Sequence, residues 1–486
     1  MKTAAEIKAW LESPTSTPIL LVETFADIAG TETALKFSVG DYSSEYLPIV
    51  SIGVEYVQQL SINLSPTNLS YSDLKIHNPN HEFDYLLNYV WSNRVIVQKV
   101  GDVEWAIDDF FTVFTGYITD IDSQDAETLN LKIIDRFQQL NAALNDVVLG
   151  GTSTNKNVIV PSAFGENFNA IPILVSQATQ TYQGHSGGQI EDFNEVLTDA
   201  KVRLVTKDLT TGKFSFTTNV GKGMVTTTMQ GDKFGGVYSK TVATVIQRIV
   251  TGYGKVTDRL TAADIDTANF AAFNTANPQT IGYYSTGREN IYPICQFLAS
   301  SVGAQMVPTM DGKLRLVKIE LPAPGVQRVI DQSYMFQKNE ELRLVERPPV
   351  QPTVVLGFCK NNAVQDNLDG IPLEHEEMLA LEWLKVKSDN STLRTKYKKT
   401  LEPVMRTTAL QIESEAQAEC DRLRILWSTQ RGVYEFVGTS ELLDLQLGDG
   451  VTLVHPYYNM SAGASGMVVK LKPNWLKREV LVGVLA

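Results

Sequence analysis

Histidine is the side chain that most often acts as a general base or metal ligand near neutral pH, and the chain has five. His77 and His81 are four residues apart, a spacing that would place both on one face of a helix as metal ligands. The intervening Asn78-Pro79-Asn80 disfavours a helix, so we expect a turn with two solvated histidines. His375 lies in Glu374-His375-Glu376-Glu377, but no second histidine follows at zinc-peptidase spacing. We expect a charged helix face there, and we predict no metal site.

Glycine-rich segments are the next candidates, because backbone N–H groups in such loops can hold phosphates. The triplet Gly221-Lys222-Gly223 leads into Met-Val-Thr-Thr-Thr at 224–228 and not into a helix, so we expect a flexible loop. No Walker-type loop is present and no Gly-x-Gly-x-x-Gly follows a strand. We also expect no Gly-x-Ser-x-Gly nucleophile elbow. The sequence therefore predicts no cofactor and no cofactor-binding residues.

Paired carboxylates could serve a glycoside hydrolase. The pairs are Asp108-Asp109, Asp120 with Asp122, and Glu376-Glu377. In a chain with 55 acidic residues such pairs are expected on solvated surfaces, and no pair is marked as buried, which acid–base catalysis would need. We predict no catalytic residues and a protein that is not an enzyme.

Cysteines and charge restrict the function further. Cys295, Cys359 and Cys420 are far apart and form no CxxC pair, so free thiols in a reducing compartment are expected. The net charge of -13 argues against binding to nucleic acid or to an anionic membrane. It would suit a channel through which DNA passes without sticking, although acidic surfaces also simply keep proteins soluble. Residues 1–13 read as a short amphipathic helix and not as a signal peptide, and no segment has the length of a membrane span.

The first 146 residues of the chain read as mostly β. The expected strands are 17–25, 54–64, 95–100, 110–117 and 128–134, with short helices at 84–90 and 135–144. The segment Gly150–Asn157 has no apolar side chain and is the best linker in the sequence. The first domain boundary is placed there.

The middle of the chain contains two similar segments, 190–217 and 291–319. Each reads as a short amphipathic helix, a strand, a Gly-Lys turn and a second strand, with the turns at Gly212-Lys213 and Gly312-Lys313. Helix–hairpin units of this kind cover one face of a small sheet with the helix. Arg347-Pro348-Pro349 marks a second boundary.

The last third of the chain begins with a strand at 354–358 and has its longest helical pattern at 409–431. Strands are expected at 434–437, 451–455, 466–471 and 479–485, which make a small antiparallel domain. The fold class is thus mainly β with α+β insertions, in several domains. The predicted ranges are 1–146 (N-terminal β domain), 147–346 (peripheral α+β domains), 347–431 (an α+β connector that ends in a helix) and 432–486 (a small C-terminal β domain).

Six segments, taken in order, resemble phage tail proteins of the baseplate-hub or tail-tip family. They are Leu60–Ile76 leading into Asn78-Pro79; Phe114–Ile118 after Trp105; Leu129–Asp135 with Leu140; Val160–Gly165 followed by Ile171-Pro172; Asp311–Leu316; and Leu445–Asp449 with Val451–Leu453. The motifs are short, and their order over most of the chain carries the resemblance. No lysozyme or peptidase domain like those fused to some tail-tip proteins is recognised, and three cysteines are too few for the four-cysteine cluster of iron–sulfur minor tail proteins.

This resemblance implies a homotrimer in which each subunit gives two tube-like β-barrels, near 17–146 and 432–486, to an inner ring around a DNA ejection channel. The ring would adapt the sixfold tail tube to a threefold tip of the virion. Its partners would be the tail tube or distal tail protein, the tape-measure protein, and spike or fibre proteins. Two alternatives remain open: a distal tail ring or fibre-attachment adaptor, and a tail-associated peptidoglycan hydrolase.

Overall fold

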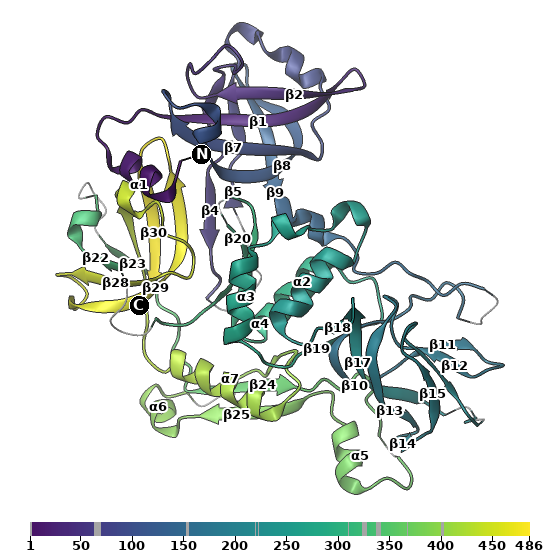
Figure 1. Ribbon diagram of the computed structural model, residues 1–486. Coiled ribbons are helices and arrows are strands. Elements are labelled where there is room, and N and C mark those ends of the chain that lie inside the picture. The colour runs from purple at the N-terminus through teal and green to yellow at the C-terminus, as the bar shows by residue number, and fades with distance from the viewer. Residues whose placement is uncertain are drawn as a thin grey trace. The chain divides into compact units, whose positions relative to one another are not determined.

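The structure is a computed structural model that describes residues 2–62, 70–151, 155–218, 220–221, 223–309, 311–322, 328–336, 342–366, 368–399 and 403–486. The chain is mainly β and forms two compact units (Figure 1). Unit 1 comprises Met1–Gln138, Val307–Pro348 and Gln430–Ala486, and unit 2 comprises Gln139–Met306 and Pro349–Thr429. The first and last β regions of the sequence therefore belong to the same unit. The division into four ranges made from the sequence stays a prediction.

The N-terminal sheet of unit 1 has the strand order β2-β1-β7-β8-β9-β6-β3. Its central strands are covered on both faces over part of their length: in β1 the side chains of Leu21 and Val22, which point to opposite faces, are fully buried, as is Ile96 in β7. The continuous apolar run Ile19–Val22 is typical of such a fully buried strand. The strands are β1 (Pro18–Ile28), β2 (Thr31–Ser38), β3 (Val50–Ile52), β6 (Leu74–His77), β7 (Arg94–Asp102), β8 (Phe111–Asp125) and β9 (Thr128–Asp135).

The two ends of this sheet are bonded to one chain segment, 47–52. At the β2 end, Leu47 N donates to Lys36 O at 3.0 Å and Ser38 N donates to Leu47 O at 2.8 Å. At the β6 end, His77 N donates to Ile49 O at 2.7 Å, and β3 pairs with β6. The segment therefore satisfies backbone groups that an open sheet would leave exposed at both edges.

The C-terminal sheet of unit 1 has the order β22-β28-β29-β30-β27-β23. One segment bonds to two strands of this sheet that are not neighbours: β22 pairs with β28, and a few residues later Phe336 N donates to Val437 O of β27 at 3.0 Å. The strands are β22 (Arg328–Ile330), β23 (Arg343–Glu346), β27 (Val433–Gly438), β28 (Gly450–His455), β29 (Met460–Asn474) and β30 (Glu479–Leu485). Figure 1 shows β28, β29 and β30 side by side in yellow.

Unit 2 is α+β. Its larger sheet contains β10 (Ser162–Ala170), β13 (Ile190–Thr198), β14 (Lys201–Val202), β17 (Val225–Phe234), β18 (Val237–Tyr238) and β19 (Gly282–Ser285). A second sheet contains β11 (Ile173–Ser176), β12 (Thr181–Gln183), β15 (Val205–Asp208) and β16 (Lys213–Phe216), and a third β24 (Thr353–Phe358), β25 (Leu384–Asp389) and β26 (Arg406–Thr407). The α-helices are α2 (Val242–Gly252), α3 (Thr267–Ala276), α4 (Ile291–Ser300), α5 (Leu373–Leu379), α6 (Ser391–Lys396) and α7 (Glu413–Leu426).

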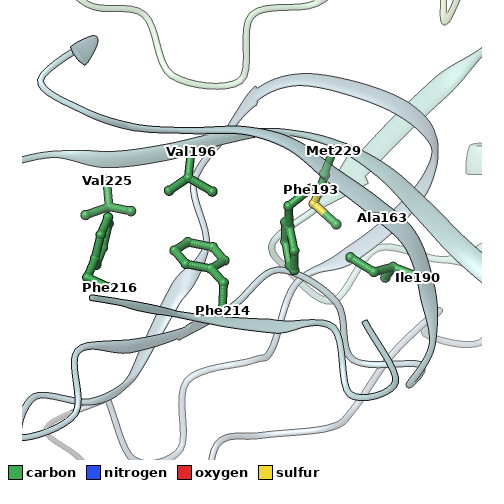
Figure 2. Close-up of a cluster of buried hydrophobic side chains, with 8 residues drawn as sticks. All are labelled: Ala163, Ile190, Phe193, Val196, Phe214, Phe216, Val225 and Met229. Carbon is green, nitrogen blue, oxygen red and sulfur yellow. The ribbon is translucent and has the colours of Figure 1, made fainter. Parts of the chain in front are cut away.

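The core between the two larger sheets of unit 2 is aromatic (Figure 2). Phe214 of β16 meets Phe193 of β13 edge-on at 5.0 Å between ring centroids. Tyr182 of β12 stacks on Phe214 from another side, at 5.6 Å. Edge-to-face and offset contacts of this kind add to the free energy of burying the rings.

Several predicted elements are confirmed. The N-terminal helix forms as α1 (Ala4–Glu12), which begins at a capping box between Thr3 and Glu6. The strand predicted at 17–25 forms as β1, the strand at 354–358 as β24, and the four C-terminal strands as β27 to β30. The long helix forms as α7, and helix 291–300 is followed by strands β20 (Ala304–Pro308) and β21 (Leu314–Lys318).

Other predictions were wrong or were met only in part. The segment at the start of 190–217, which was expected to be a helix, is strand β13. A bulge between Phe193 and Glu195 places Phe193 and Val196 on one side of this strand. Their spacing of three residues therefore resembles that of a helix. The short helices expected at 84–90 and 135–144 form over part of these ranges, as the 3₁₀ helices η2 (Asp84–Asn88) and η4 (Arg136–Asn141). Of the strand expected at 54–64, β4 (Tyr56–Gln59) is present. Residues 63–69, 152–154 and Lys222, on which parts of other predictions fall, lie outside the described residues.

Candidate functional site

Of the two histidines predicted to lie in a turn, His81 does, and His77 is the last residue of strand β6. Pro79–His81 form a 3₁₀ turn in which Phe83 N donates to the buried Asn78 side chain at 2.7 Å. His77 and His81 are exposed, and His81 Nδ1 lies 3.4 Å from Asp84 Oδ2. Across the described ranges, no group of three or more His, Cys, Asp or Glu side chains is arranged to hold a metal ion.

The acidic candidates are at the surface. His375 and its neighbouring glutamates lie on α5, with His375, Glu374 and Glu377 exposed. Asp108, Asp120 and Asp122 are exposed as well. Hydrogen bonds from Asn130 and Lys132 lower the pKa of Asp122, which is the wrong direction for a general acid.

The three cysteines are free thiols. Burial raises the pKa of all three, and that of Cys420 to about 11. A thiol with a raised pKa holds little thiolate at neutral pH and is a poor nucleophile. Cys295 and Cys420 are buried in unit 2, and Cys359 is partly buried. All three therefore pack as small apolar residues.

The sequence prediction missed a buried polar cluster in unit 2, formed by His185, Asp232, Arg248 and Tyr253, which we call the Asp232 cluster. Arg248 Nε donates to Asp232 Oδ2 at 2.8 Å, and Tyr253 Oη donates to Asp232 Oδ1. His185 Nε2 lies 3.0 Å from Tyr253 Oη and 3.4 Å from Asp232 Oδ1. His185 and Asp232 are almost completely buried. The cluster thus connects β17, which carries Asp232, with helix α2 and the turn that follows it.

The charges of the Asp232 cluster are set by burial and hydrogen bonding. Burial raises the pKa of Asp232, but hydrogen bonds from His185, Arg248 and Tyr253 outweigh it and hold that pKa below the usual aspartate range. Burial and the neighbouring Asp232 carboxylate raise the pKa of Tyr253. His185 Nδ1 accepts from Ala163 N at 3.0 Å, so the ring proton sits on Nε2, where it faces the tyrosine and the carboxylate.

The loop around His185 contains a Gly-x-Ser-x-Gly spacing, Gly184-His185-Ser186-Gly187-Gly188, contrary to our expectation from the sequence. A nucleophile elbow joins a strand to a helix, whereas this loop joins strands β12 and β13. Ser186 Oγ is hydrogen-bonded to Ser162 Oγ at 2.8 Å, and both nitrogens of His185 have partners of their own. The loop packs closely against Tyr253, because a Cβ on Gly187 would lie 2.1 Å from Tyr253 Oη.

A cleft of about 520 Å³ borders the Asp232 cluster. Arg248, Lys255 and Arg259 line it together with Ser186 and Tyr253. Arg248 is paired with Asp232, and the Arg259 guanidinium donates to Gly254 O at 2.9 Å. Arg248 therefore stabilises the Asp232 cluster, and Arg259 stabilises the backbone at Gly254. Both arginines have a structural role.

The two sheets of unit 1 are joined by β4, which leaves the N-terminal sheet and pairs with β29 of the C-terminal sheet. Next to this pairing, Leu60 N donates to Val469 O at 2.8 Å, and Lys472 Nζ lies 2.8 Å from Glu55 Oε2. On the N-terminal sheet, Tyr56 stacks on Phe114 with 5.7 Å between ring centroids. β4 thus carries both main-chain and side-chain links between the sheets.

The chain before β1 makes a second link between the sheets of unit 1. Trp10 Nε1 of α1 donates to the buried Asp102 carboxylate of β7 at 2.8 Å, and Thr17 N donates to the same oxygen at 2.7 Å. Arg478, in the turn before β30, donates to Ser13 O at 2.6 Å. Unit 1 therefore consists of two sheets that are linked through β4 and through the chain before β1.

No described helix combines the length and the apolar character needed to cross a bilayer.

No protein-family model matches the sequence, and no curated protein matches it. Solved structures of tail proteins are similar to it. The 43 kDa tail protein of prophage MuSo2 from Shewanella oneidensis shares 9% identity at a TM-score of 0.41, over 95% of this chain and 98% of that one. The tail protein from Neisseria meningitidis MC58 shares 10% at 0.38, over 96% of each chain. A chain from the virion of a native gene transfer agent particle shares 11% at 0.46, over 72% of this chain and 91% of that one.

Proposed function

We propose that this chain is a structural, non-enzymatic protein of a phage tail. More specifically, it is the trimeric hub at the distal end of the tail tube. Three copies adapt the sixfold tube to a threefold tip and surround the channel through which DNA leaves the virion. Its partners are the tail tube or distal tail protein, the tape-measure protein, and the spike or fibre proteins.

The main observation in support of this proposal is the architecture of unit 1. One chain contributes two β modules. In the first, segment 47–52 bonds to both ends of the sheet, and in the second, segment 328–336 bonds to the non-neighbouring strands β28 and β27. The modules are fixed to each other through the pairing of β4 with β29. A trimer of such chains supplies six β modules for a ring, which is the number that a sixfold tube would meet.

The charge of the chain fits this role. Six modules around a DNA channel would have to let phosphates pass, and a net charge of -13 discourages contact with them. Two of the three cations of the cleft beside the Asp232 cluster, Arg248 and Arg259, are held by a carboxylate and a backbone carbonyl.

The test is negative-stain electron microscopy of the purified chain, with class averages scored for symmetry. Threefold particles with a central hole and six inner lobes are expected. Rings of six subunits would favour a distal tail ring instead, and a threefold oligomer without a channel would overturn the hub. Clearing of peptidoglycan in a zymogram, lost on mutation of one acid pair, would overturn the non-enzymatic assignment.

A further inference from the structure

A second cleft in unit 2, of about 280 Å³, has a different chemistry from the first. Three aromatic side chains line it: Tyr283 of β19, Phe297 of α4, and Trp383 just before β25. All three are partly exposed, and the Tyr283 and Phe297 ring centroids are 6.0 Å apart. Its volume is close to the lower end of the range of about 300–1,000 Å³ that is typical of small-molecule sites.

The walls of this aromatic cleft are tied together by main-chain hydrogen bonds. Strand β19 is bonded to the segment after β26 through Gly282 N to Ala409 O at 2.9 Å and Gln411 N to Thr280 O at 3.1 Å. That segment is bonded in turn to the end of β24 through Cys359 N to Leu410 O at 2.8 Å. The cleft is therefore preformed, which lowers the entropy cost of binding a ligand in it.

The polar groups of the aromatic cleft are mostly uncharged amides. Asn167, Asn362 and Gln411 line it, and the NH₂ group of each donates to a backbone carbonyl, at 3.2, 2.9 and 3.1 Å respectively. These bonds fix the orientation of the amides, so the side-chain oxygens are the atoms left to accept hydrogen bonds from a ligand. Two charged residues of opposite sign, Glu289 and Lys360, also line the cleft.

The two charged groups are held beside aromatic rings. Glu289 Oε1 accepts from Tyr283 Oη at 3.2 Å, and Lys360 Nζ lies 5.7 Å from the centroid of the Trp383 ring. The formal charges of the lining therefore cancel. A nucleotide would require several cations for its phosphates, while a purely apolar ligand would leave the amide oxygens without partners.

We propose that this cleft binds an uncharged saccharide, one or two sugar rings of a glycan. A sugar ring has an apolar C–H face that can pack on Trp383 and Tyr283, and hydroxyls that can donate to the amide and carboxylate oxygens. This combination of flat apolar area and acceptors at its rim is the chemistry that the lining offers. The proposal goes beyond the hub and does not depend on it, because a trimeric hub could lack this site and a monomer could have it.

The test is isothermal titration calorimetry of the full chain with uncharged oligosaccharides: chitotetraose, cellotetraose and maltotetraose. At least one should bind at millimolar concentration or below. Trp383→Leu, which keeps an apolar side chain but removes the ring, should weaken that binding by about tenfold or more, and Trp383→Phe should restore most of it. Glu289→Gln, at an exposed position, should weaken it severalfold without disturbing the fold.

The matched control is Tyr457→Ala, because Tyr457 is an exposed aromatic residue, 56% accessible, in the other unit of the chain. It should leave saccharide binding unchanged. The proposal is overturned if none of the three oligosaccharides binds, if Trp383→Leu and Glu289→Gln bind as well as the unmodified chain, or if a mononucleotide displaces the saccharide. A change of oligomeric state in electron microscopy would bear on the hub alone and leave this result unaffected.

Discussion

Replacing Asp232 with asparagine removes the negative charge that faces Arg248 in the interior of unit 2. The Asp232 side chain is 3% exposed and that of Arg248 14%, and their closest atoms are 2.8 Å apart. Removing one partner of a buried ion pair costs about 3–5 kcal/mol, because the other charge stays buried without compensation. Asparagine keeps an oxygen that can still accept from Tyr253, so we expect a loss near the lower value, about 3 kcal/mol.

The assay is thermal unfolding followed by calorimetry, with hydrogen exchange at the amides of β17 and α2 to identify the transition of unit 2. A loss of about 3 kcal/mol corresponds to a decrease in Tm of roughly 6–12 °C for a unit of this size. The matched control is Asp192→Asn, which breaks the 2.8 Å pair with Lys207 at the surface, where the two side chains are 39% and 37% exposed. That pair should contribute about 0–1 kcal/mol.

The effect of pH follows from the direction of the Asp232 pKa. Because the folded-state pKa lies below the unfolded value, the carboxylate stabilises unit 2 above the unfolded pKa, about 3.9, and this stabilisation is lost as pH falls through the lower folded value. The stability gap between the unmodified chain and Asp232→Asn should therefore shrink in strong acid. Equal losses for Asp232→Asn and Asp192→Asn, or a gap that does not change with pH, would refute the reasoning.

Three further substitutions or treatments test the packing of the chain. Gly187→Ala should cost about 1–3 kcal/mol in urea unfolding, because its Cβ would lie 2.1 Å from the tyrosine hydroxyl of the Asp232 cluster; Gly150→Ala, with no atom within 4 Å of its Cβ, should be nearly neutral. Phe193→Ala should cost about 3–5 kcal/mol because the ring is fully buried; Phe25→Ala, at a position 46% exposed, should cost much less by the same measurement. Cys420, with a pKa near 11, should react with a thiol reagent at pH 8 only after unfolding, and rapid labelling of the native chain would contradict its burial.

Some elements of this protein could be read directly from the sequence because local interactions decide them. The capping box of Thr3 and Glu6 starts α1 within a single turn, and the apolar run in β1 suits a strand regardless of its partners. The solvated turn at His77–His81 follows from Pro79, which cannot continue a helix. In each case the residues that specify the structure are neighbours in the chain.

The strand β13 could not be predicted from its local sequence. Its apolar residues Phe193 and Val196 have the spacing of a helix, and the bulge that puts them on one face of a strand arises from pairing with β17, more than thirty residues away along the chain. The segments 47–52 and 328–336 likewise link non-neighbouring strands of their sheets only when those distant strands are in place. The local pattern of apolar residues is the same whether or not such distant partners exist, so it cannot predict them.

The sequence alone therefore determined that the chain is a mainly β protein in several domains. The tertiary structure decided which polar residues are buried together. His185, Asp232, Arg248 and Tyr253 come from three separate parts of the chain, and nothing in their local sequence marks them as partners. The aromatic cleft is likewise assembled from β10, β19, α4 and the segments around β24 to β26. The physical reason is that burial and hydrogen bonding depend on distances in space, and these are fixed only when the sheets and helices have packed.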